Sequence, residues 1–131
     1  MKKIFVFILM SSFIMLIAGC QSNKVPDGVS PEMYKIGTEA HDIGQQYIDG
    51  KLTAASTVQK LDKLYKEADK IWEEEKKNSK DTDYIYDLFI SGTIVDMEIA
   101  AEQEDQFAML DHLEQLEKVM KGKEGQEEET E

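Results

Sequence analysis

The sequence has little of several residue types, and each scarcity narrows the possible functions. Its 131 residues include one Cys, two Pro and no Arg. A lone Cys excludes a disulfide-stapled scaffold, and the length allows at most one modest domain. The 15 Lys are outnumbered by 27 acidic residues, which gives a formal net charge of -12. Because DNA, RNA and anionic lipid surfaces repel so acidic a chain, we expect no nucleic-acid partner.

Motifs for catalysis and metal binding are missing as well. The two histidines, His41 and His112, have no second Cys and no Glu-x-x-His spacing to complete a metal site. Asp81, Asp83 and Asp87 have the spacing of a calcium loop, but the oxygen ligand and the Gly required between them are absent. There is no Gly-rich phosphate loop and no Ser, His, Asp set. We therefore expect no enzymatic activity, no catalytic residue, no metal and no cofactor.

The longest apolar run lies at the N-terminus. Lys2 and Lys3 precede a 14-residue apolar stretch, residues 4–17, that is interrupted only by Ser11 and Ser12. A short cationic segment, an apolar core of this length and small residues after it are typical of a secretory signal peptide. The run falls short of the roughly 20 apolar residues that a permanent membrane span needs. We therefore expect residues 1–19 to be a cleaved signal peptide.

The cleavage site contains the only Cys of the chain. Ile17-Ala18-Gly19-Cys20 resembles the lipobox of bacterial lipoproteins, in which a branched aliphatic residue and two small residues precede Cys. The resemblance implies that Cys20 carries diacylglycerol on its sulfur and becomes the mature N-terminus. Two acyl chains form a stable anchor, which places the chain on the extracytoplasmic face of the cell membrane. The alternatives are ordinary secretory cleavage with a free Cys, or an uncleaved anchor.

The mature chain is predicted to be all-α. Residues 20–29 are polar and turn-forming, which predicts a short tether after the lipidated Cys. Ser30 and Pro31 are typical of a helix start, and Gly50 of a helix end, so a first helix is expected between them. Thr53 begins a second helix, whose charged end runs into residues 78–81. Gly37 and Gly44, one heptad apart, indicate the close approach of a neighbouring helix to the first.

The third helical segment is the longest. From Asp83 to about Lys121 the sequence has no Pro and a single Gly, Gly92. Apolar residues recur at alternating spacings of 3 and 4, which predicts a buried seam. The seam comprises Ile85, Leu88, Gly92, Val95 and Ile99, then Met109, Leu113, Leu116 and Met120, with polar Glu102 and Gln106 between them. Because no Gly or Pro lies within residues 102–106 to reverse the chain, one continuous helix is favoured over a hairpin.

These lengths predict a three-helix, up-down-up bundle over residues 30–121, with an overlong third helix and a disordered acidic tail, residues 122–131. The end of the third helix would have no cover from its own chain. The predicted partner-binding stripe on that overhang comprises Met109, Leu110, Leu113, Leu116 and Met120. Three outcomes stay open for the stripe: docking of a protein partner, pairing of two copies in a homodimer, or folding back at residues 102–106.

In size, anchor and helical content the chain resembles the small exclusion and immunity lipoproteins that mobile elements of Gram-positive bacteria place on the cell surface. The resemblance implies a non-enzymatic protein-interaction module that blocks the entry of further mobile DNA. One alternative is a structural or accessory lipoprotein of a cell-envelope assembly. Another is a small hydrophobic-ligand binder, since an apolar pocket is conceivable among the aromatic residues.

Overall fold

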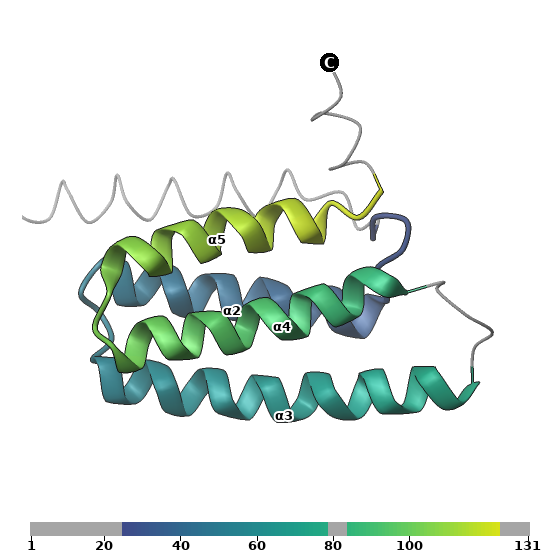
Figure 1. Cartoon of the computed structure of the whole chain (residues 1–131), viewed down its shortest axis with the longest axis horizontal. Coiled ribbons are helices and arrows are strands. Elements are labelled where there is room, and N and C mark those ends of the chain that lie inside the picture. Colours follow the sequence, from purple (N-terminus) through teal and green to yellow (C-terminus); the bar gives the residue numbers. More distant parts are fainter. Residues whose placement is uncertain (1–24, 79–83, 124–131) are drawn as a thin grey trace, which may run out of the picture.

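The computed structural model describes residues 25–78 and 84–123, and this part of the chain contains four helices and no strand. They are α2 (Pro31–Ile48), α3 (Ala54–Asn78), α4 (Ile85–Glu102) and α5 (Gln106–Met120). The helices lie roughly antiparallel, and each packs against its neighbours in chain order, with α5 closing the ring against α2 (Figure 1). The predicted all-α class is confirmed, whereas the predicted three-helix bundle is not found.

Helix α2 begins and ends, and α3 begins, where their capping residues predict. Ser30 is the N-cap of α2, its hydroxyl accepting a hydrogen bond from the Met33 N–H (3.2 Å). Gly50, directly after the C-cap, has a φ of +72°, a backbone conformation that Gly adopts without penalty. At the start of α3 the Thr53 hydroxyl accepts from the Ser56 N–H (3.2 Å). Local hydrogen bonding therefore fixes these boundaries.

The expected continuous helix over residues 83–121 is wrong, because the chain reverses at residues 103–105. Glu104 is the described non-Gly residue with positive φ, +53°, a conformation that costs an L-residue roughly 1 kcal/mol. Asp105 then caps α5, its carboxylate accepting from the Ala108 N–H (3.0 Å). The reversal lets α5 bury its apolar seam against the other helices, and that burial outweighs the local strain of one residue.

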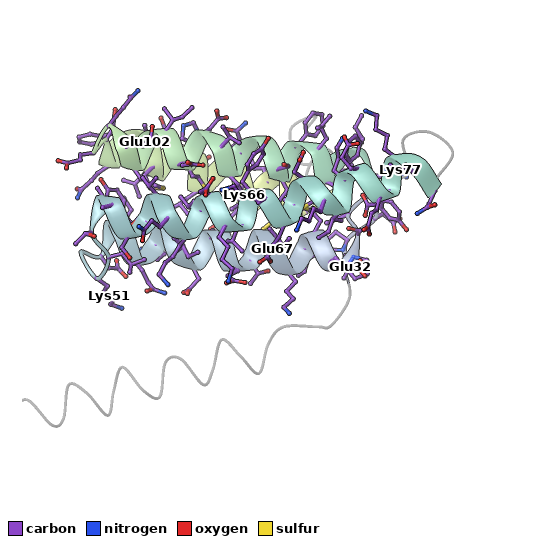
Figure 2. All side chains as sticks on the ribbon, turned by 90° about the horizontal axis from the view of Figure 1, so that it is seen from below. Glu32, Lys51, Lys66, Glu67, Lys77 and Glu102 are labelled. Carbon is purple, nitrogen blue, oxygen red and sulfur yellow. The ribbon has the colours of Figure 1, made fainter. Side chains whose placement is uncertain are left out.

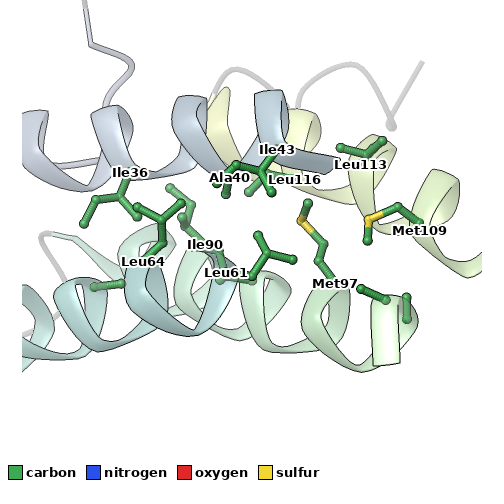
Figure 3. Packing of buried hydrophobic residues seen from close by; sticks show 14 of the residues in the cluster. Ile36, Ala40, Ile43, Leu61, Leu64, Ile90, Met97, Met109, Leu113 and Leu116 are labelled. Carbon is green, nitrogen blue, oxygen red and sulfur yellow. The ribbon is translucent and has the colours of Figure 1, made fainter. Parts of the chain in front are cut away.

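The core lies along the axis of the bundle, and each of the four helices contributes to it (Figure 3). Ala40 from α2, Leu61 from α3, Ile94 from α4 and Leu116 from α5 are fully buried. Charged side chains cover much of the outside, as Lys66 and Glu67 on α3 illustrate (Figure 2). The ion pairs they form are exposed, so they add little to stability. Burial of the four apolar seams is therefore what holds the bundle together.

Both ends of the described chain meet at one end of the bundle. Val29 is buried, and the Lys123 N–H donates to the Asp27 carbonyl oxygen (3.2 Å). Residues 25–29 are thus packed on the bundle, which corrects the predicted tether over 20–29 for this half. Gly122 is buried as well, so the bundle extends two residues into the predicted tail.

The remaining terminal predictions lie outside the described residues. These are the signal peptide (1–19), Cys20 with the first part of the tether (20–24), and residues 124–131 of the predicted disordered tail. Within the described part of the chain, no helix combines the length and apolar character needed to cross a membrane.

Candidate interaction surface

The predicted partner-binding stripe on α5 is mostly a core seam. Met109, Leu113 and Leu116 are at most 4% exposed, and Met120 packs, half-buried, against the core. Leu110 alone is exposed, to 46%. The overhang that would have presented these residues does not exist, because the hairpin at residues 103–105 folds α5 onto α2 and α4. Of the three outcomes left open for the stripe, folding back is the one observed.

Most of the large apolar side chains that the described residues expose lie instead on α4. The sequence pattern assigned Ile85, Leu88, Gly92, Val95 and Ile99 to the buried seam, and this assignment is wrong. The residues that face the core are Tyr86, Asp87, Ile90, Ser91, Thr93, Ile94, Met97, Ala100 and Ala101. The expected seam faces away from the core, with Ile85, Leu88 and Ile99 39–44% exposed. Helix α4 is therefore apolar on both of its faces.

We call this surface the outer face of α4 and define it by six apolar residues: Ile85, Leu88, Phe89, Gly92, Val95 and Ile99. Val95 is half-buried, and the other five are exposed. Asp96 is the charged residue on the same side of the helix. A helix that is apolar all round is normally enclosed by protein on every side, whereas the described part of the chain covers α4 on one side only. The outer face of α4 is thus the candidate site for a partner.

Gly92 lies in the middle of this outer face. A Cβ built on it would meet nothing within 4 Å, so the fold of one chain does not require Gly there. The glycines of α2 contrast with it. A Cβ on Gly37 would lie 2.9 Å from the Met120 sulfur, and one on Gly44 would lie 2.7 Å from both Leu113 Cδ2 and Met97 Cε. The prediction that Gly37 and Gly44 admit a neighbouring helix is confirmed.

A carboxyl pair joins three elements at the end of the bundle where the chain termini meet. Asp87 is fully buried, and its Oδ1 accepts a hydrogen bond from the Ser30 N–H (2.9 Å). Its Oδ2 is also buried, and none of the hydrogen bonds seen among the described residues ends on it. Glu75, near the end of α3, is the group that can supply one, because the two carboxyls interact directly when Glu75 carries a proton.

The environment of Glu75 favours that proton. Burial, the hydrogen bond with Asp87 and the negative charges of Asp87 and Glu32 raise the pKa of Glu75 to about 7, although a hydrogen bond with Ser30 opposes the shift. Protonated Glu75 ties the end of α3 to Asp87 at the start of α4, and through Asp87 to the N-cap of α2. The sequence pattern did not reveal this pair, which resembles a shared-proton site in its chemistry.

A groove lies between α2, α5 and the segment before α2. It has a volume of about 310 Å³ and is lined by Pro26, Tyr34, Thr38, His41, Glu117, Met120 and Lys121. His41 and Glu117 bridge its wall at 2.8 Å. The groove is open to solvent and its polar rim is internally paired, so it offers an apolar ligand little enclosure.

The remaining candidate residues do not assemble into a reactive site. His41 lies against Glu117, whereas His112 on α5 faces Gln115 at 3.5 Å. No three His, Cys, Asp or Glu residues of the described segments are grouped to hold a metal ion. Asp81 and Asp83 lie outside those segments, and Asp87 contacts Ser30 rather than a loop.

No protein-family model, no curated protein and no solved structure matches this chain. The geometry of the bundle is therefore what carries the functional argument.

Proposed function

We propose that this chain is a non-enzymatic protein-interaction module, held at the extracytoplasmic face of the cell membrane by acyl chains on Cys20. The outer face of α4 is its contact surface. The observation that carries the proposal is that α4 is apolar on both faces, while residues 25–78 and 84–123 cover only one of them. Leaving several large apolar side chains of one helix in water has no benefit for an isolated bundle, and contiguous patches of this kind mark contact sites.

The chemistry of the surroundings favours a protein over a lipid surface. A helix that lies on a membrane carries Lys or Arg beside its apolar face. The outer face of α4 contains Asp96, and Glu98 and Glu102 follow on the same helix, which has no Lys at all. Negative charge along α4 would meet repulsion from anionic headgroups, whereas another apolar helix would cover the face without that cost.

The anchor and the contact surface complement each other. Lipidation of Cys20 would confine the module to a membrane, where a modest contact area suffices because partners in the same plane meet at high effective concentration. Residues 20–24 span at most about 18 Å when extended, so the bundle would stay close to the bilayer. Exclusion of incoming mobile DNA remains our favoured role for such a module, and an accessory role in an envelope assembly is the alternative.

The test replaces Leu88 with Glu in the full, lipidated chain. Leu88 and Leu110 are equally exposed, 44% and 46%, and they lie on different helices, so Leu110→Glu is a matched control. Both variants should fold with unchanged thermal stability. In native electrophoresis of mild-detergent membrane extracts, the natural protein should run as a complex larger than one chain. The amount of this larger complex should fall at least tenfold for Leu88→Glu and stay unchanged for Leu110→Glu.

Two further measurements on cells that make these variants test the lipid anchor and the role in exclusion separately. A Cys20→Ser variant should leave the membrane fraction, which tests the anchor. The frequency with which the cells accept conjugating or phage DNA should rise in the Leu88→Glu strain if the module acts in exclusion, and should stay constant if its role is accessory. A complex that survives Leu88→Glu as well as it survives Leu110→Glu would contradict the proposed surface.

A further inference from the structure

Asp96 lies within the outer face of α4, so a partner that covers the face covers its carboxylate as well. It follows Gly92 by four residues and precedes Ile99 by three, which places the three residues on one side of the helix. Asp96 is exposed, and its side chain makes no hydrogen bond or ion pair with the described segments. Burying a carboxylate without a compensating partner is costly. An occupant of the face therefore has to offer Asp96 a donor, and a cation is the strongest one.

The surroundings of Asp96 are acidic too. Over residues 84–117 the sequence has nine acidic residues and no Lys or Arg. Glu98 lies three residues after Val95, and Glu102 lies seven after it, so both follow the Val95 edge of the outer face. An excess of negative charge of this kind attracts a positively charged surface and repels an acidic one, a second copy of this chain included.

Repulsion among these carboxylates is evident at Glu98. Burial raises the pKa of this carboxyl, and the negative charges of Asp62 and Glu102 raise it further, whereas Lys66 opposes them. Lys66 is itself held by Asp62, at 2.7 Å. A cation that a partner brings to this edge would therefore meet negative charge that Lys66 does not neutralise.

The apolar part of the outer face has the length and width of one helix. From Ile85 to Ile99 it rises about 21 Å. Ile85, Leu88 and Phe89 are 39–45% exposed, and Ile99 is 44% exposed. Because these residues recur at spacings of three and four, they form a stripe along α4, and a second amphipathic helix of about four turns is the element that covers such a stripe.

We infer that the occupant of the outer face of α4 is a cationic amphipathic helix of another protein. Its apolar side covers Leu88 and Ile99, and a Lys or Arg in or beside that side pairs with Asp96. Further basic residues on the same helix meet the acidic edge at Glu98 and Glu102, which makes the complex sensitive to salt. This inference rests on the proposed function, since it names the partner of the same surface.

A pair of synthetic peptides tests the chemistry of the partner. Both are amphipathic helices of about 18 residues with the same stripe of Leu, and the positions beside the stripe carry Lys in one peptide and Glu in the other. The full, lipidated chain is placed in phosphatidylcholine vesicles, and fluorescence anisotropy measures peptide binding above that of empty vesicles. The Lys peptide should bind at least tenfold more tightly than the Glu peptide. Asp96→Lys should narrow that preference at least fivefold.

Asp111→Lys is the matched control, because it makes the same charge change at an exposed Asp of α5, outside the outer face. It should leave the preference unchanged, whereas Leu88→Glu should weaken binding of the Lys peptide at least tenfold. Equal binding of the two peptides to the natural chain would overturn the cationic helix. Equal effects of Asp96→Lys and Asp111→Lys would overturn it as well.

Asp96→Leu puts the same question to the natural complex. Leu is the better helix former, so thermal stability should not fall. A cationic partner would lose its ion pair, and the larger complex seen in native electrophoresis should decrease at least tenfold. A partner that offers only apolar surface, or a second copy, would bind the variant more tightly. If Asp96→Leu retains the complex and Leu88→Glu removes it, the cationic helix is overturned and the proposed function stands. If Leu88→Glu also leaves the complex intact, both fail.

Discussion

Leu116→Asp is expected to unfold most of the protein. Leu116 is completely buried in the seam that α5 contributes to the core (Figure 3). The substitution removes a large apolar side chain and leaves a carboxyl group without a designed partner, at a combined cost of about 4 kcal/mol or more. Natural domains are stable by only about 5–15 kcal/mol, so little stability would remain. Circular dichroism during urea denaturation measures the loss.

Leu110→Asp provides the control for this result, since Leu110 is nearly half-exposed on the same helix. A surface substitution of this kind should change the free energy of unfolding by no more than about 0.5 kcal/mol. The contrast separates the four-helix bundle from a three-helix bundle with an overhanging stripe. In the latter both positions would be tolerated alike, and equal stabilities of the two variants would contradict the hairpin at residues 103–105.

The protein is expected to become less stable as the pH rises from about 5 to 8. Glu75 has a pKa of about 7 in the folded chain, against 4.5 as its ordinary value. The folded state therefore binds a proton that the unfolded state has already released, and stability falls with rising pH across that interval. Because Glu75 is partly exposed, we expect a loss of about 1–2 kcal/mol rather than the full amount that the shift implies. Urea denaturation at each pH measures it.

Glu75→Gln separates this effect from the general repulsion among the 27 acidic residues. The amide donates a hydrogen bond to Asp87 at every pH, as protonated Glu75 does only at low pH. The variant should match the natural protein near pH 5 and exceed its stability near pH 8. Parallel stability curves for the two proteins would show that Glu75 and Asp87 do not share a proton.

Helix boundaries were predictable where a local signal marks them. Ser30 and Pro31 begin α2, and Gly50 follows its end, because capping depends on a few neighbouring residues. The reversal after α4 has one local signal, the N-cap Asp105, and no Gly or Pro marks the turn itself. Glu104 adopts a left-handed conformation that its side chain does not favour, and the gain that compensates comes from α5 packing on distant segments. Periodicity alone does not contain that information.

The choice of face on α4 shows a second limit of the sequence. Residues 90, 94, 97 and 101 repeat at the same alternating spacing as residues 85, 88, 92, 95 and 99, and both sets are largely apolar. Periodicity identifies a helix here but does not decide which side faces the core. The side that faces the core includes the fully buried Asp87, one of whose oxygens accepts a hydrogen bond from the Ser30 N–H. Two apolar stripes on one helix are also the feature of the sequence that could have predicted the candidate interaction surface.

The central claim is that another protein covers the outer face of α4 in the cell, and photocrosslinking tests it most directly. Phe89 and Phe107 are each replaced by the photoreactive analogue benzoylphenylalanine in the full chain, and whole cells are irradiated. Phe89 lies on the outer face and is 45% exposed, whereas Phe107 lies on α5 and is 84% exposed. We predict protein adducts at position 89 and none at 107. Equal adducts at both positions, or adducts at 107 alone, would contradict the account.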